Sequence, residues 1–164
     1  MEIAYLHDLF KAQYELDATI AKNHNVTYEN TLVRRIMALV VEVGELANAT
    51  RCFKFWSNKS SEPKEVVLDE YADGLHFLLS LGIAVGSTKE NYEIVKESDD
   101  LTEQFLNVYH QVDLFRINKD IESYEKAFSS FLALMIPLGY TWKELEEAYY
   151  KKLGVNFHRQ ETNY

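Results

Sequence analysis

The sequence contains a single cysteine, Cys52, and only two prolines and six glycines among its 164 residues. One cysteine cannot form an internal disulfide, so we expect a cytoplasmic protein of a reducing compartment. The scarcity of proline and glycine disfavours a fold with many tight turns and predicts long, uninterrupted helices. Hydrophobic residues make up 47% of the chain, which is too many for a disordered protein.

Basic residues are also scarce, since 17 lysines and arginines stand against 26 aspartates and glutamates and give a net charge of −9. A surface of this sign repels phosphate backbones, so nucleic acid is not expected as a main partner. An anionic small molecule that brings its own cations is still compatible with this charge. No hydrophobic run is long enough to span a membrane, and the first ten residues lack the basic start of a signal peptide.

Apolar residues recur at helical spacing along most of the chain, and no alternating strand pattern is evident. We therefore predict a single all-α domain over residues 1–164, a bundle of five to six helices. The last helix should begin at Thr141, in the capping-box sequence TWKE, and end at Gly154, before a polar tail. The other expected helices cover about residues 3–21, 32–50, 64–85, part of 87–119, and 119–136.

Two pairs of acids stand in otherwise apolar helical segments. Glu42 and Glu45 are the only charged residues between positions 36 and 49, and Glu70 and Asp73 share a helix face with Phe77. Ionised carboxylates three residues apart repel each other, and burial is unfavourable unless a cation or hydrogen bonds compensate. Two facing helices with such pairs could surround Mg²⁺, or Mn²⁺ as a substitute, because hard carboxylate oxygens suit these ions. Salt bridges between helices are the alternative explanation.

The spacing of these acids resembles that of a known family. The sequence EVGE at 42–45, followed by EYAD at 70–73, is similar to the metal-binding pattern of the dimeric all-α dUTPases, which are related to MazG proteins within the all-α NTP pyrophosphatase superfamily. The resemblance implies a four-helix metal-binding core, a homodimer, and hydrolysis of dUTP, and usually dUDP, to dUMP. The family is common in phages and in some bacteria.

Further segments resemble substrate-binding motifs of the same family. In QYELD, Gln13 and Asp17 would help to recognise the base, although many relatives have asparagine at position 17. In FKFW, Trp56 is similar to an aromatic residue that stacks on uracil, and Lys54 to a nearby phosphate contact. His76 matches a histidine that lines the deoxyribose pocket. The segment 152–164 resembles the C-terminal motif and is expected to be a substrate-binding tail, with contacts from Lys152, Asn156, Arg159, Gln160 and Tyr164.

The resemblance implies metal-assisted hydrolysis of the α–β phosphoanhydride. One of the glutamates Glu42 and Glu45, with Glu45 preferred, would orient or deprotonate the attacking water. Lys54, Lys152 and Arg159 would bind the phosphates. Two other functions stay open: a pyrophosphatase that prefers dCTP or accepts NTPs generally, and a non-catalytic helical interaction protein. Residues 87–119, which carry no recognised motif, could contact a regulatory protein partner.

Overall fold

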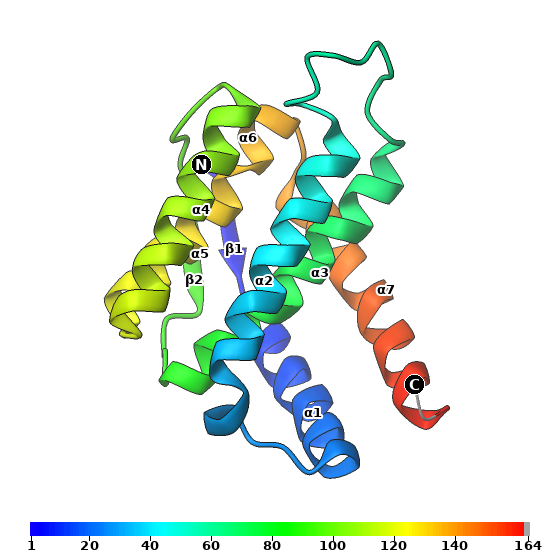
Figure 1. The fold of residues 1–164 in the computed structure, drawn as a ribbon. Helices are drawn as coiled ribbons and strands as arrows, with labels where there is room; N and C mark the ends of the chain where they lie inside the picture. The colour runs from blue at the N-terminus through cyan, green and yellow to red at the C-terminus, as the bar shows by residue number, and fades with distance from the viewer. Residues whose placement is uncertain (163–164) are drawn as a thin grey trace.

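The chain folds into long helices joined by short connections, as Figure 1 shows for residues 1–162, the residues that this computed structural model describes. Within them the helices are α1 (His7–His24), α2 (Tyr28–Thr50), α3 (Lys64–Val85), α4 (Leu101–Asn118), α5 (Ile121–Ala133), the single-turn α6 (Met135–Leu138) and α7 (Trp142–Glu161). Two three-residue strands, β1 (Ile3–Tyr5) and β2 (Asn91–Glu93), also form. The expected all-α fold class is confirmed.

Helices α2 and α3 form the centre of the fold and run in opposite directions beside each other (Figure 1). Helix α2 buries Ile36, Leu39, Val43 and Leu46, which are spaced three or four residues apart and therefore share one face. Helix α3 is buried over most of its length, because it packs against α1, α2, α5 and α7. This packing fixes the positions of the acids that α2 and α3 carry.

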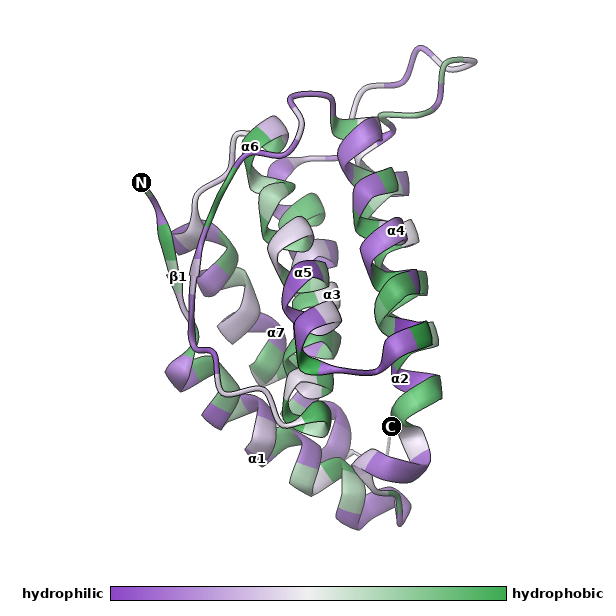
Figure 2. Cartoon of the chain, turned by 90° about the vertical axis from the view of Figure 1, so that its left-hand side faces the viewer, coloured by the Kyte–Doolittle hydropathy of each residue, from purple (hydrophilic) through white to green (hydrophobic). Residues whose placement is uncertain are grey.

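Hydrophobic and hydrophilic residues alternate in bands along α1 and α4, as Figure 2 shows and as amphipathic helices require. Helix α4 buries Phe105, Val108, Val112 and Phe115, which are spaced three or four residues apart and share one face. No helix within residues 1–162 has both the length and the apolar character needed to cross a membrane.

Several helix ends follow the local chemistry of the sequence. Helix α3 has the expected bounds and ends at Gly86, whose φ of 79° closes the helix. The capping box at Thr141 and Glu144 begins α7 as predicted. A second capping box, in which Thr27 and Asn30 exchange hydrogen bonds, begins α2 four residues before the expected start.

The expected start of the first helix at residue 3 is wrong. Residues 3–5 form β1, which pairs antiparallel with β2 so that Ala4 lies opposite Tyr92. Both of these residues are buried in the core. A strand of three residues is too short to show an alternating pattern, and its partner lies far along the chain, so the sequence gives no local signal for it.

The expected end of the last helix at Gly154 is also wrong. Helix α7 continues to Glu161, and Gly154 lies on its exposed side, where an added Cβ atom would meet no other atom within 4 Å. The glycines that do close helices, Gly86 and Gly139, have positive φ angles, whereas Gly154 does not. Residues 155–161 are therefore helical instead of an irregular tail, and Tyr164 lies outside the described residues.

We predict that Gly154→Ala stabilises the protein by about 0.5–1 kcal/mol, because alanine loses less backbone entropy than glycine in a helix interior. Thermal unfolding followed by circular dichroism measures the effect. The matched control is Gly86→Ala, which forces alanine into the left-handed region and should lower the midpoint. A loss of stability in Gly154→Ala would contradict the helical conformation at this position.

Candidate active site

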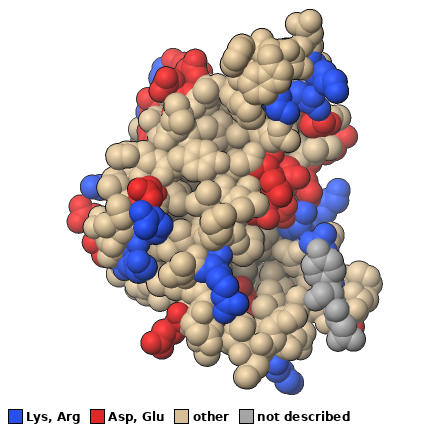
Figure 3. Space-filling model, in the orientation of Figure 1, with Lys and Arg blue, Asp and Glu red and all other residues tan. Residues whose placement is uncertain are grey.

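The structure brings the four predicted carboxylates together where α2 and α3 face each other. Carboxylate oxygens of Glu42, Glu45 and Glu70 lie within 4.8 Å of one another, and a second group joins Glu70 and Asp73 to Asp69 under the same limit. Figure 3 shows acidic side chains gathered over these helices, with basic side chains beside them. The i, i+3 spacing on each helix places both pairs on the shared face.

Burial makes the ionised form of these acids unfavourable. It raises the pKa of Glu42 to about 8, and the negative charge of Asp73 adds to the effect. Burial likewise raises the pKa of Glu70 to about 7, again with a contribution from Asp73. One oxygen of each glutamate, Oε2, is buried and has no hydrogen-bond partner within the described residues. Unpartnered carboxylate oxygens at this separation fit a hard divalent cation.

Lys152 supplies a counter-charge that the spacing of the acids did not reveal. Its Nζ atom, carried by α7, lies 2.9 Å from Oδ2 of Asp69 and 3.1 Å from Oδ1 of Asp73. Burial lowers the pKa of Lys152, but its contacts with these aspartates outweigh burial and leave the pKa raised. Asp69 was not recognised in the sequence as a site residue, because its partner comes from a distant helix.

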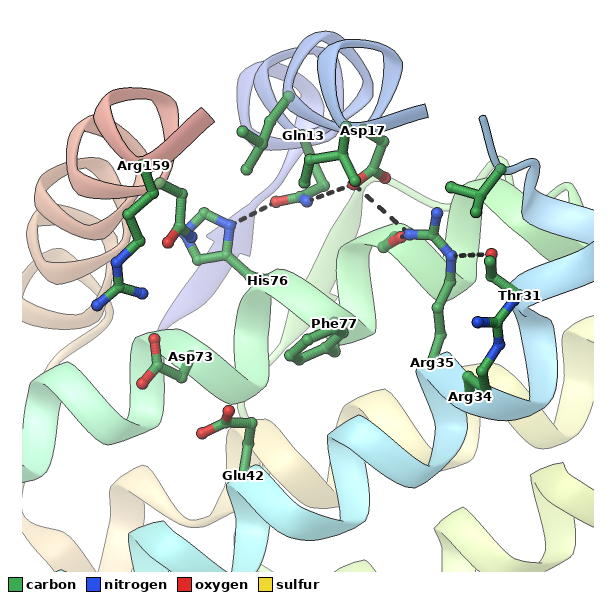
Figure 4. Close-up of a pocket in the computed structure, with 15 residues that line it drawn as sticks. Gln13, Asp17, Thr31, Arg34, Arg35, Glu42, Asp73, His76, Phe77 and Arg159 are labelled. Atoms are coloured by element: carbon green, nitrogen blue, oxygen red, sulfur yellow. Dashed lines mark hydrogen bonds and ion pairs between the residues drawn. The ribbon is translucent and has the colours of Figure 1, made fainter. Parts of the chain in front are cut away.

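A pocket of about 430 Å³ lies beside the acids, between α1, α2, α3 and the end of α7 (Figure 4). Glu42 and Asp73 form the part of its wall nearest the acidic group. The predicted substrate contacts that line the pocket are Gln13, Asp17, His76, Asn156 and Arg159. Four segments of the chain thus meet in one cavity, next to a candidate metal site.

Buried polar residues at the inner wall of this pocket form one hydrogen-bonded group. Gln13 Nε2 donates to Asp17 Oδ1 over 2.9 Å, and the Tyr28 hydroxyl donates to Asp17 Oδ2 over the same distance. Gln13 Oε1 lies 2.6 Å from His76 Nδ1. Burial lowers the pKa of His76 to about 3, although the main chain of Tyr149 offsets this in part, so the imidazole is neutral at physiological pH.

Arg35 is a site residue that the sequence analysis missed. Its Nη1 atom lies 3.6 Å from Asp17 Oδ1, and its Nε–H donates to Thr31 Oγ1 over 2.8 Å. The guanidinium also lies over the ring of Tyr28, with 4.8 Å between its carbon and the ring centroid. Arg35 precedes Glu42 by seven residues, which places both on the same face of α2 and was the available signal.

Lys54 and Trp56 do not line the pocket. They follow the end of α2, whereas Arg35 lies near its beginning, and 15 residues of helix separate Arg35 from Thr50 by about 20 Å. Trp56 is 65% exposed, and its ring packs edge-on against Phe55 with 5.1 Å between centroids. The structure thus keeps the predicted stacking residue away from the predicted base contacts.

Gln160 also has another partner. Its Oε1 accepts a hydrogen bond of 3.1 Å from Asn23 Nδ2 at the end of α1, and it does not line the pocket. The contact joins the C-terminal part of α7 to α1. Gln160 is therefore placed to hold the two helices that form one side of the cavity.

A family model described as dUTPase matches residues 5–164. The chain belongs to this dUTPase family. The match spans nearly the whole sequence and agrees with the all-α architecture, so the resemblance seen in the motifs is confirmed. No curated protein matches the sequence significantly. Family membership supports a hydrolase that acts on dUTP as the general function of the chain.

The raised pKa values predict how the metal-free dUTPase responds to pH. Glu42 and Glu70 hold protons in the folded state up to about pH 8 and 7, whereas the unfolded chain releases them near the ordinary value of 4.5. The contribution of these two groups to the free energy of unfolding is therefore fully present below about pH 4.5. It is lost as the pH rises through about 7 and 8. Melting curves in EDTA between about pH 5 and 9 should show a smaller loss for Glu42→Gln than for the wild type. An equal loss of melting temperature with pH in the two proteins would contradict the raised pKa of Glu42.

Proposed function

We propose that this dUTPase is a magnesium-dependent diphosphatase that converts dUTP to dUMP and pyrophosphate, and dUDP to dUMP and phosphate. The observation that carries the proposal is the position of the acidic cluster on α2 and α3. It lies at the edge of the pocket, whose wall includes Gln13, Asp17 and His76. A nucleotide bound with its nucleoside in this pocket would extend its phosphates toward the acids. Membership of the dUTPase family supports uracil as the base.

Glu42, Glu45, Glu70 and Asp73 would hold the magnesium ions, with Mn²⁺ as a possible substitute. The unpartnered oxygens of Glu42 and Glu70 support this choice of ligands. Bound there, magnesium would offset the charge of the triphosphate and increase the acidity of water. An acidic site needs such ions, since carboxylates alone would repel the phosphates.

The remaining chemistry falls to the side chains. Glu45 is exposed at the edge of the cluster, where it would orient a water molecule and accept its proton; Glu42 stands one helical turn away. The water oxygen forms a bond to the α-phosphorus, and the bond to the bridging oxygen breaks, which releases pyrophosphate with its electron pair. Lys152 and Arg159 would bind the departing phosphates, which is supported by the contact of Lys152 with Asp73 and by the position of Arg159 in the wall of the pocket.

The nucleoside contacts come from the other end of the pocket. Gln13, Asp17, His76 and Asn156 would surround the base and the deoxyribose. The roles expected of Lys54 and Trp56 would require the connection 51–63 to move toward the pocket, so we assign them no contact.

An exposed apolar surface on α2 and α4 supports a homodimer. Val33, Met37 and Val41 follow one line of α2 and are 65%, 60% and 44% exposed. Leu106 and Ile117 of the neighbouring α4 are 57% and 59% exposed. Such patches mark contact surfaces in proteins of this size. Light scattering should give the mass of two chains, and the mass of one chain at micromolar concentration would reject the dimer.

We predict that Glu45→Gln lowers kcat for dUTP by roughly 10²–10⁴-fold, because the amide cannot accept the proton of the attacking water. The fold should persist, with an unchanged far-ultraviolet spectrum, since Glu45 is exposed. Chromatography of the products of dUTP and Mg²⁺ measures both turnover and the release of pyrophosphate. The matched control is Glu103→Gln, an exposed glutamate in the first turn of α4.

The same assay distinguishes the rival functions. Equal turnover of dUTP, dCTP, dTTP and UTP would favour a general nucleotide pyrophosphatase. Stepwise release of phosphate from dUTP would contradict attack at the α-phosphorus. Undiminished turnover in Glu45→Gln would overturn the role of this glutamate, and the absence of turnover in the wild type would favour a non-catalytic protein.

A further inference from the structure

Four polar side chains from three helices form a continuous chain along the pocket wall (Figure 4). Arg35 of α2 pairs with Asp17 of α1, Asp17 accepts from Gln13 of the same helix, and Gln13 contacts His76 of α3. All four residues line the cavity. The chain ends at His76 Nε2, a buried atom without a hydrogen-bond partner within residues 1–162.

The chemistry of each contact fixes which atom donates and which accepts along this series of hydrogen bonds. An ionised carboxylate can only accept hydrogen bonds, so the amide nitrogen of Gln13 must face Asp17. The amide oxygen of Gln13 is then left facing His76, 2.6 Å from Nδ1. Because an amide oxygen also only accepts, Nδ1 must carry the imidazole proton. His76 Nε2 consequently presents a lone pair.

The opposite tautomer would place two acceptors against each other. With the proton on Nε2, the lone pairs of Nδ1 and Gln13 Oε1 would face each other at 2.6 Å. The Tyr149 hydroxyl lies 3.1 Å from the same Oε1 and 3.3 Å from the Leu9 carbonyl oxygen, and its single proton can be donated to either. The main chain of Tyr149 also forms a hydrogen bond with the ring of His76, and this contact opposes the effect of burial on the pKa of His76.

The ionised state of Asp17 is the condition on which this direction depends. Asp17 is only 3% exposed, and a buried carboxylate needs donors and an opposite charge to stay ionised. Tyr28 supplies a donor, and Arg35 supplies the charge. Arg35 is itself held by Thr31 Oγ1 and by a short hydrogen bond to Ser80 Oγ. An asparagine at position 17 could donate as well as accept and would impose no direction.

We propose that Arg35 is a positioning residue for His76: through Asp17 and Gln13 it holds the His76 proton on Nδ1, and the Nε2 lone pair then accepts a hydrogen bond from the bound substrate. His76 is 5% exposed, and its Nε2 atom has no hydrogen-bond partner among the described residues. A donor that reaches Nε2 therefore replaces no hydrogen bond within the described part of the protein. The acceptor role toward a nucleoside rests on the proposed function. The position of the proton does not, because it follows from the contacts of the free protein.

Nitrogen-15 NMR of histidine-labelled protein tests the inference without any nucleotide. The chain has five histidines, and the signals that His76→Gln removes identify His76. In the wild type near neutral pH we expect a protonated Nδ1 and an unprotonated Nε2. In Arg35→Gln the two nitrogens should lose this difference as both tautomers become populated, and Arg35→Lys, which keeps the charge, should restore it.

Arg34→Gln is the matched control, because it removes the same charge one residue away, where the guanidinium donates to the Asn30 carbonyl instead of to Asp17. Its His76 signals should match the wild type. A protonated Nε2 in the wild type, or an unchanged tautomer in Arg35→Gln, would overturn the inference. If Arg35→Gln does not fold, Asp17→Asn tests the same link, and an unchanged tautomer there has the same meaning. Turnover of dUTP decides the proposed function separately.

Discussion

The excess of negative charge at the contact between α2 and α3 is the constraint around which the site is arranged. Glu42, Glu45, Glu70 and Asp73 lie close together, and the ammonium of Lys152 offsets only part of their charge. Apolar packing on the buried faces of both helices keeps the acids in place despite their repulsion. Burial and this repulsion raise the pKa values of Glu42 and Glu70, so both side chains keep their protons above the usual pH range of a glutamate. Divalent cations would offset the same repulsion and would make a bound water molecule more acidic.

The distribution of charge along the pocket gives the site its polarity. Acids occupy one end, and the neutral and paired groups around Asp17 and His76 occupy the other. Arg159 lines the cavity, and Lys152 lies at the acids on the same helix. This arrangement suits a ligand with an uncharged heterocycle at one end and a polyanion at the other, which is the form of a nucleotide bound with metal ions.

Helix α7 makes the site depend on both ends of the sequence. It carries Lys152 to the acids and Asn156 to the pocket, and Gln160 joins it to α1. Because α7 continues without a break through Gly154, the same helix places Lys152 at the acids and Asn156 and Arg159 on the wall of the cavity. The site is thus assembled from α1, α2, α3 and α7, and it forms only when these helices pack together.

Sequence reasoning reached the features that depend on local spacing. The i, i+3 acids, the bounds of α3 and the capping box at Thr141 are read from residues within one or two turns of each other. It failed where the partner lies far away along the sequence. Strand β1 forms by pairing with β2, Asp69 is bound by Lys152, and Asp17 is paired with Arg35. The distance of Trp56 from the pocket could not be read from the sequence for a related reason, since a motif match gives the order of residues along the chain and not the distance across the fold.

We expect the carboxylates between α2 and α3 to form a binding site for divalent cations. Anomalous diffraction from crystals soaked in Mn²⁺ tests it most directly, because it locates the ion whatever the activity of the protein. We predict an anomalous peak within coordination distance of oxygens from Glu42, Glu45, Glu70 and Asp73. Full occupancy of Mn²⁺ elsewhere, with Lys152 still paired to Asp69 and Asp73 and no peak at these acids, would contradict it.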